Sequence, residues 1–366
     1  MHLSFQKSFF TIGTIFAFIA ALILAKSIFI PLAFALLIAF ILFPVCRKIE
    51  TWGVSKILAV FLSIFTLFLI IAGIIFIFSN RIVNISEEFT EFRNQLLKLF
   101  ADITVYINDN IGFVDDLEHG ELYAKLKTWL NESTGTLLSK TFSGTSNFLF
   151  GLMIAVVFSF LILLYRKGLV NAAVHFYAQE NRSQALKMFQ SVQKVGQKYL
   201  SGMFFVIFII GVLNSLGLWI IGIDHPILFG FLAALMSIVP YAGALIGASI
   251  PVLYGFMTED SIWMPITIAI YFWAVQVLES NFLTPKIVGT NLKLNALNTI
   301  LSIIIGSSVW GVAGMILFLP FTAMFKVVCQ EYTVLKPVAL LMGDSNYSKD
   351  KSNDKSKWFE KVKSWF

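Results

Sequence analysis

The chain has 366 residues, of which 58% are hydrophobic and 13% are charged, and its mean hydropathy is +0.82. A soluble domain carries about a quarter charged residues, so this composition excludes a soluble globular protein and predicts a polytopic membrane protein. The formal net charge of +6 does not indicate nucleic-acid binding, because basic residues gather in the cytoplasmic loops of any membrane protein.

The first third of the chain predicts three transmembrane helices and then a polar insert. Apolar runs at 9–25, 28–45 and 57–79 are each close to the roughly 20 residues that a crossing needs, so residues 1–79 form the first unit. In residues 80–146, acidic side chains outnumber basic ones and apolar residues recur at helical spacing. We expect an α-helical extracytoplasmic insert there, which caps the protein or contacts another subunit; direct capture of substrate is the alternative.

The rest of the chain predicts three more crossings and a polar tail. The fourth span, 147–165, leads into a basic helical loop, so 147–200 forms a unit with a cytoplasmic end. The transport core, 201–335, contains spans at 201–222 and 262–283 and two further apolar segments. Residues 336–366 form a cytoplasmic tail whose last ten residues suit an amphipathic helix lying on anionic lipid.

Two stretches in the core predict helical hairpins that dip into the membrane. Residues 225–256 and 294–325 each contain two apolar runs separated by small or helix-breaking residues. The arm 226–239 reaches about 21 Å at 1.5 Å per residue, short of a 30 Å hydrocarbon core, which favours re-entrant hairpins over two full crossings. The breaks contain Ser237, Pro240, Tyr241 and Gly243 in the first hairpin, and Gly306 and Gly311 in the second, whose returning arm meets Pro320.

Charge in the loops sets the predicted topology. Basic loops at 46–56, 166–200 and 284–293 alternate with acidic ones at 80–146 and 259–260, which places both termini in the cytoplasm. The spans 201–222 and 262–283 then cross the membrane in opposite directions, and each is followed by a hairpin. The two span-and-hairpin units therefore form an inverted repeat, as in many secondary transporters. The fold class is therefore an all-α polytopic membrane protein with about six full transmembrane helices plus two hairpins, eight apolar segments in all.

The strongest candidate for function is Glu279, because charged groups at membrane depth are costly. Gln276 shares its helix face, Asn281 follows, and Pro285 is expected to end the helix. A carboxylate here could exchange a proton, hold a cation or cap the neighbouring hairpin. The alternative is an acid at the membrane surface paired with Lys286.

Two other features have a structural and a functional interpretation. Asn214 in the fifth span lies at membrane depth, where it could contact substrate or form an interhelical hydrogen bond. Gly243 and Gly247 form a GxxxG pattern that suits close packing inside the first hairpin. Its functional interpretation is that backbone groups freed by the break bind a polar solute.

Motifs for catalysis are absent from the sequence. The histidines lie at the N-terminus or in expected loops, and there is no HExxH pattern, Walker A loop or GxSxG elbow. We therefore expect no enzyme activity, no catalytic residue, no metal site and no cofactor, apart from coupling to sodium or protons.

These residues give the core a family resemblance. The runs Ser237-Ile238-Val239-Pro240-Tyr241-Ala242-Gly243 and Glu279-Ser280-Asn281, with Leu283-Thr284-Pro285-Lys286 and the glycines of the second hairpin, are similar to the autoinducer-2 exporter family of bacterial transporters. The resemblance implies a homo-oligomeric permease. Members are associated with export of the quorum-sensing signal autoinducer-2, and others with sodium or lithium/proton antiport.

The sequence thus predicts a multi-pass secondary transporter of the bacterial cytoplasmic (inner) membrane, exporting a small polar solute by alternating access. One alternative is a sodium (lithium)/proton antiporter, and another is a membrane scaffold acting through residues 80–146. Expected partners are the small-molecule or ion substrate, the lipid bilayer and further copies of the chain, with no nucleic acid. The candidate binding residues are Glu279, Asn281, Gln276, Asn214, Ser237, Pro240, Tyr241, Gly243, Gly247, Pro285, Gly306, Gly311 and Pro320.

Overall fold

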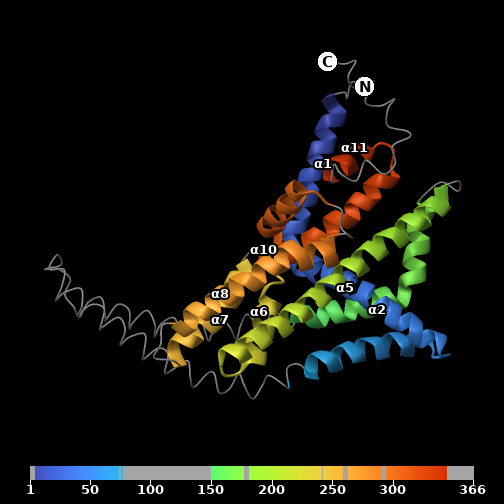
Figure 1. Ribbon diagram of the computed structural model, residues 1–366. Coiled ribbons are helices and arrows are strands. Elements are labelled where there is room, and N and C mark those ends of the chain that lie inside the picture. Colours follow the sequence, from blue (N-terminus) through green and yellow to red (C-terminus); the bar gives the residue numbers. More distant parts are fainter. Residues whose placement is uncertain are drawn as a thin grey trace, which may run out of the picture.

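The computed structural model describes residues 5–73, 76, 150–176, 181–240, 242–258, 263–289 and 294–343 (Figure 1). These residues are helical, with no β-strand among them beyond a single bridge between Leu294 and Gly343. The predicted insert 80–146, Tyr241 and the predicted amphipathic end of the tail lie outside the described residues. The elements are α1 (Phe5–Leu24), α2 (Lys26–Thr51), the helices Lys56–Gly73 and Phe150–His175, α5 (Arg182–Ile221), α6 (Pro226–Met236), α7 (Ala242–Thr258), α8 (Trp263–Leu278), α10 (Ala296–Glu331) and α11 (Lys336–Met342).

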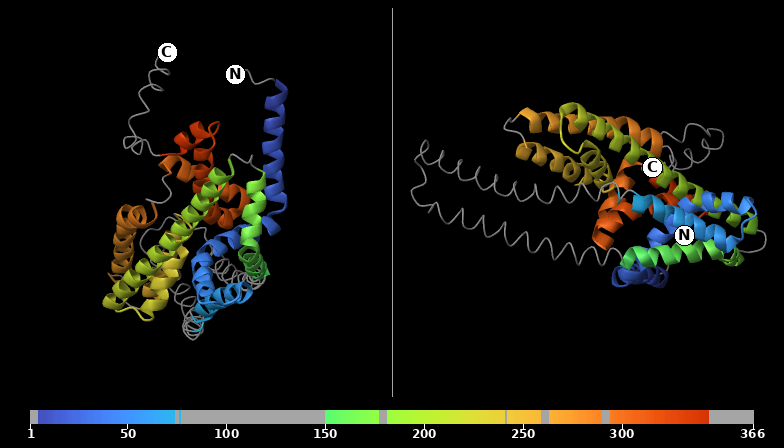
Figure 2. Two further views of the ribbon diagram at one scale, coloured as in Figure 1. Left: turned by 90° about the vertical axis from the view of Figure 1, so that its right-hand side faces the viewer. Right: turned by 90° about the horizontal axis from the view of Figure 1, so that it is seen from below.

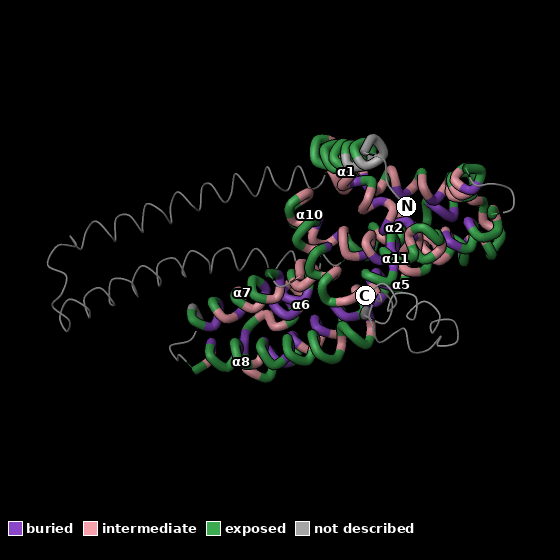
Figure 3. The backbone as a smooth tube through the Cα atoms, turned by 90° about the horizontal axis from the view of Figure 1, so that it is seen from above, coloured by how far each residue is buried: buried purple, intermediate pink, exposed green. Residues whose placement is uncertain are grey.

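The helices confirm an all-α polytopic membrane protein. Six of them in the described residues are long and apolar enough to cross a membrane, and α1 adds a further apolar helix of 20 residues. Large apolar side chains such as Phe16, Phe61 and Trp273 are more than half exposed. Buried residues concentrate where the helices face one another, while the outward faces are exposed (Figure 3). In a bilayer these outward faces meet lipid.

Helix α5 is longer than expected. The sequence places a cytoplasmic loop up to residue 200 and a span from 201, whereas α5 runs without a break for 40 residues. At 1.5 Å per residue this is about 60 Å, roughly twice the hydrocarbon thickness. The polar first half therefore continues the span as a rigid extension.

The first hairpin consists of α6 and α7, joined by a short turn after Met236. A Cβ atom on Gly247 would lie 2.8 Å from the backbone of Ala233, and one on Gly243 would collide with the carbonyl of Met236. Both glycines therefore let the two arms touch through their backbones, which is the close packing that their spacing predicts.

The second hairpin lies within α10. Its backbone leaves the helical region at Gly311, with φ 60° and ψ −136°, a conformation that glycine adopts with little strain. The two arms then run back along each other: the Ser302 hydroxyl donates to Thr322 Oγ1 at 2.9 Å, and a Cβ on Gly314 would collide with the Gly306 carbonyl. The hairpin predicted at 294–325 is present. Whether either hairpin is re-entrant stays a prediction.

Both hairpins meet the long helices in one core. Buried residues of this core come from α2 (Leu37), α5 (Ile210), the first hairpin (Ala234), α8 (Val275) and the second hairpin (Leu317). The views in Figures 1 and 2 show α5 running beside α6 through the middle of the bundle. Each hairpin therefore packs on the long helices, and these helices hold the two hairpins in the same core.

The N-terminal helices pack around this core. The Trp310 indole, next to the bend of the second hairpin, donates to the carbonyl O of Leu22 in α1 at 2.9 Å. Figure 2 shows α1 along one side of the bundle. Arg166 forms a half-buried ion pair with Glu50 that joins the helix Phe150–His175 to α2. The tip of the second hairpin thus rests on α1, while a separate ion pair anchors α2.

We predict that Gly314→Val disrupts the second hairpin. The new side chain would collide with the backbone of Gly306, and overpacking of this kind costs about 3 kcal/mol. Thermal unfolding of the purified protein in detergent measures the loss. Gly151→Val is the matched control, because no atom lies within 4 Å of the Cβ position there, so its effect stays within about 0.5 kcal/mol. Equal unfolding midpoints for the two variants would refute the tight contact.

Candidate functional site

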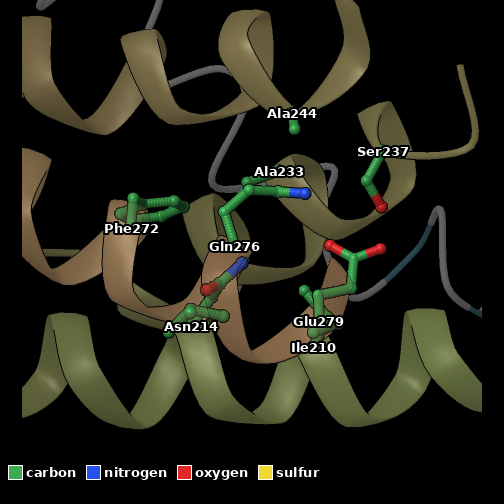
Figure 4. A pocket seen from close by; sticks show the side chains of 9 residues that line it. Ile210, Asn214, Ala233, Ser237, Ala244, Phe272, Gln276 and Glu279 are labelled. Atoms are coloured by element: carbon green, nitrogen blue, oxygen red, sulfur yellow. The ribbon is translucent and has the colours of Figure 1, made fainter. Parts of the chain in front are cut away.

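A small polar pocket lies where α5, the first hairpin and α8 meet (Figure 4). Its volume of about 10 Å³ is close to what one water molecule needs. Its lining consists of four polar residues among apolar ones: Ile210, Asn214, Ala233, Ser237, Ala244, Phe272, Val275, Gln276 and Glu279. Four of the predicted candidates therefore come together here, namely Asn214, Ser237, Gln276 and Glu279.

Glu279 brings the negative charge to this pocket. It lies one residue beyond the end of α8 and is half-buried, and Gln276 lines the same pocket one turn earlier. Glu279 forms no ion pair with another described residue. The ion pair among the described residues joins Arg166 to Glu50, away from the pocket. The alternative pairing with Lys286, whose side chain is exposed, is not formed. The carboxylate is thus available to a ligand.

Asn214 brings an unsatisfied acceptor. Its side chain on α5 is only 3% exposed, and its Oδ1 atom has no hydrogen-bond partner in the described part of the chain. The neighbouring Ser215 hydroxyl donates within its own helix, to the carbonyl O of Gly211. The interhelical hydrogen bond considered for Asn214 is not made by its Oδ1 atom. Burying such an atom without a partner costs about 1–3 kcal/mol, which a ligand would recover.

Ser237 approaches the same space from the turn of the first hairpin. Its hydroxyl donates to the carbonyl O of Ala234 at 2.7 Å, so its oxygen faces the pocket as an acceptor. Figure 4 shows the Ser237 oxygen and the Glu279 carboxylate pointing into one space, with Asn214 below them on α5. Pro240 lies further along the turn and does not line the pocket.

The helix does not end at Pro285, contrary to expectation. It continues after α8 as two π-helical turns, Glu279–Leu283 and Pro285–Gly289. A proline inside an α-helix clashes with the carbonyl four residues earlier, and the wider π turn relieves that clash. Single π turns inside helices often occur at functional sites.

Asn281 supports this wide turn from outside the pocket. Its side-chain amide donates to the carbonyl O of Val277 at 2.9 Å, and the backbone N–H of Thr284 bonds to Glu279 O, five residues back. The π turns also bring Ile287 and Val288 against α5 at Gly202. Asn281 and Pro285 thus shape the segment that carries Glu279.

The remaining candidates lie in the hairpins, away from the pocket lining. Gly243 and Gly247 allow the arms of the first hairpin to touch. In the second hairpin Gly306 lies in the contact between the arms, Gly311 forms the bend, and Pro320 is buried in the returning arm. Sequence reasoning missed the apolar lining. Phe272, Val275, Gln276 and Glu279 recur at helical spacing, a pattern that marks one helix face and could have identified the lining from α8.

The described residues contain no group of three or more His, Cys, Asp or Glu side chains that could hold a metal ion. In the pocket itself, one carboxylate lies among two side-chain amides and one hydroxyl group, which offer both hydrogen-bond donors and acceptors to a polar ligand.

Comparison with known proteins decides the class of this protein. The model of the AI-2E family transporter matches residues 12–334. The chain belongs to the AI-2E transporter family. It is therefore a membrane transport protein and not an enzyme.

Relatives from distant bacteria align along most of their length. YrrI of Bacillus subtilis strain 168, named provisionally as a transport protein, is 26% identical over 83% of this chain and 86% of its own. A provisionally named transport protein of Borreliella burgdorferi is 23% identical over 96% and 94%. The AI-2 transport protein TqsA of Escherichia coli K12 is 21% identical over 92% and 95%. This chain therefore shares the overall plan of AI-2E proteins.

We predict that Pro285→Ala impairs transport although it changes no side chain in the pocket. Alanine permits an α-helical turn, which would rotate the segment after Glu279 and withdraw Val288 from α5. We expect transport by vesicles containing the purified protein to fall by at least about fivefold, the lower end of coupling between linked elements. Pro44→Ala, at another proline inside a transmembrane helix, is the matched control. Wild-type rates in the Pro285 variant would show that the π turns are dispensable.

Proposed function

We propose that this AI-2E protein exports a small polar solute from the cell by alternating access, and that the solute passes through the pocket of Asn214, Ser237, Gln276 and Glu279. The observation that carries the proposal is a polar pocket placed beside a broken helix in an otherwise apolar core. Breaks of this kind at membrane depth mark the binding sites of many transporters.

The polar groups suit an uncharged or weakly charged solute rich in hydroxyl groups. Asn214, Ser237 and Gln276 supply amide and hydroxyl groups, while Phe272 and Val275 offer apolar contact. Autoinducer-2 belongs to this class of solute, and the relative TqsA is named for its transport. We therefore propose autoinducer-2 as the first solute to test.

The pocket must widen to admit any solute larger than water. Helices α5 and α6 are in backbone contact, since a Cβ on Gly230 would collide with Ser215. Helix α8 touches α5 through a side chain: the Tyr271 ring lies against Gly217, and its hydroxyl donates to Leu213 O at 2.6 Å. We propose that α5 and the first hairpin move together, and that α8 and its π turns move against them.

We propose that the protein lies in the bacterial cytoplasmic (inner) membrane with both termini in the cytoplasm, as the charged loops predict. We also propose that several copies of the chain assemble. The scaffold alternative depends on residues 80–146, which lie outside the described residues, and nothing in the pocket favours it.

Sodium (lithium)/proton antiport is a second candidate. One observation favours it: the half-buried Glu279 carboxylate has no basic partner among the described residues. Such a carboxylate can exchange a proton for a cation.

We predict that Glu279→Gln lowers autoinducer-2 flux in sealed vesicles by about tenfold or more, because glutamine keeps the size of the side chain but loses its charge-assisted hydrogen bonds. Glu331→Gln, whose carboxylate contacts Gln184 away from the pocket, is the matched control and should transport normally.

A pH-sensitive dye in the same vesicles separates the two candidates. The exporter proposal expects autoinducer-2 flux from the wild type. No autoinducer-2 flux, together with sodium-driven proton movement that Glu279→Gln abolishes, would overturn it in favour of antiport.

A further inference from the structure

A stripe of exposed side chains runs along one face of α5 and changes from basic to aromatic. Lys187, Lys194 and Lys198 are exposed, and Phe205 and Phe208 follow them with more than half of their surface exposed. At about 100° per residue, the three lysines and Phe205 lie within about 40° of one another around the helix. The same face therefore passes from charged to apolar within about two turns, between Lys198 and Phe205.

This change marks the surface of the membrane. Phe205 faces outward from a helix long and apolar enough to span the bilayer, so lipid chains cover it. Lys198 lies about 10 Å further along at 1.5 Å per residue, the headgroup layer is roughly 5–8 Å thick in each leaflet, and a lysine stem reaches back toward such a layer. Lys194 and Lys198 are therefore positioned at the headgroups, whereas Lys187 lies about 16 Å beyond Lys198 along the helix.

A further lysine, Lys286, comes from the π turns after α8. It is exposed and directly precedes Ile287, whose carbonyl O would lie 3.1 Å from a Cβ atom on Gly202 of α5. Gly202 is one helical turn from Lys198, so the π turns place Lys286 next to the end of the lysine stripe. Lys194, Lys198 and Lys286 together form the junction lysines, because they lie where the π turns meet α5.

The junction lysines form no ion pair with another described residue. Glu331 contacts Gln184, which is about 15 Å along α5 from Lys194, and Glu279 belongs to the pocket. Three positive charges thus lie beside an apolar surface that faces lipid. Such a surface suits a ligand with a negative headgroup and apolar chains, because one end meets the charges and the other meets the phenylalanines.

We propose that an anionic phospholipid of the surrounding bilayer binds at this junction. Its phosphate is held by the junction lysines, and its acyl chains lie along Phe205 and Phe208. The binding follows from the charged and aromatic faces alone. Its consequence for transport rests on the proposed function: the lipid bridges α5 and the π turns, which are the elements proposed to move against each other, and so stabilises their contact.

A general attraction between basic residues and anionic lipid predicts a different result. In that case any exposed lysine near the membrane surface contributes alike. Lys187 shares the helix face of the junction lysines but lies past the headgroup layer. Lys48 is exposed in the last turn of α2, a helix end that packs in a separate cluster of buried residues. These two lysines are therefore the matched controls for a specific site.

The test measures lipid binding without any transported solute. Thermal unfolding of the full-length protein in detergent is followed while phosphatidylglycerol or phosphatidylcholine of the same chain length is added. A ligand that binds the folded state raises the unfolding midpoint in a saturable way. We expect a saturable rise with phosphatidylglycerol and none with phosphatidylcholine. Equal effects of the two lipids, or no effect of either, would overturn the proposal.

Substitutions locate the headgroup, and the exposed side chains involved can be replaced without disturbing the core. Lys198→Gln and Lys286→Gln should each raise the half-saturating phosphatidylglycerol concentration by about fivefold, as expected for losing one lysine at an anionic surface. Lys198→Arg keeps the charge and should keep the wild-type value. Lys187→Gln and Lys48→Gln should leave it unchanged. Equal shifts in all four glutamine variants, or no shift in any, would overturn the site.

A headgroup without chains separates a lipid site from a site for free phosphate. Glycerol phosphate carries a negative phosphate but has no acyl chain to lie along the phenylalanines. It should not raise the unfolding midpoint at the concentrations at which phosphatidylglycerol saturates. An equal rise with glycerol phosphate would show a site for soluble phosphates and overturn the lipid assignment.

The lipid test and the vesicle test fail separately. Autoinducer-2 flux from a protein that phosphatidylglycerol does not stabilise would remove the lipid site and leave the exporter standing. Stabilisation by phosphatidylglycerol without flux of this solute would support the lipid site and remove the proposed solute.

Discussion

The fold depends on the requirement that backbone polar groups at membrane depth find partners inside the protein. A helix interrupted in the membrane exposes N–H and C=O groups that lipid cannot satisfy. Here both interruptions occur where glycine lets two arms touch backbone to backbone, at Gly243 and Gly247 in the first hairpin and at Gly306 and Gly314 in the second. The long helices α2 and α5 contribute buried residues to one core together with both hairpins.

This requirement explains why the hairpins could be predicted from sequence. Short apolar arms, a proline or glycine break and a return arm leave few other arrangements, and the bend at Gly311 lies inside the predicted break. The structure beyond Glu279 could not be predicted in the same way. Pro285 was expected to end the helix, because a proline inside an α-helix usually costs a hydrogen bond. Packing of Val288 on α5 and the Asn281 side chain offset this cost, and neither contact is visible in local sequence.

The pocket itself was predictable only in its polar part. Glu279 and Gln276 share a helix face by spacing, and Asn214 attracts attention because polar residues are rare at membrane depth. That Ser237 would join them, while Asn281 and Gly311 would not, depends on how the first hairpin sits on α5. The contact of Gly230 with Ser215 fixes that position, and it links residues from two helices that sequence patterns treat separately.

The pocket differs from the rest of the core because it contains polar groups without a hydrogen-bond or ion-pair partner among the described residues. The hydroxyl groups of Ser215, Ser237 and Tyr271, in or near the pocket, each donate a hydrogen bond to a backbone carbonyl. Asn214 Oδ1 is an exception in the described core, and it lies beside an acid without a basic partner. Proteins pay for such unsatisfied groups in stability. A ligand that bonds to these groups removes that cost, so ligand binding stabilises the closed, occupied state relative to the empty one. The unsatisfied oxygen and the unpaired acid can therefore act as a single site.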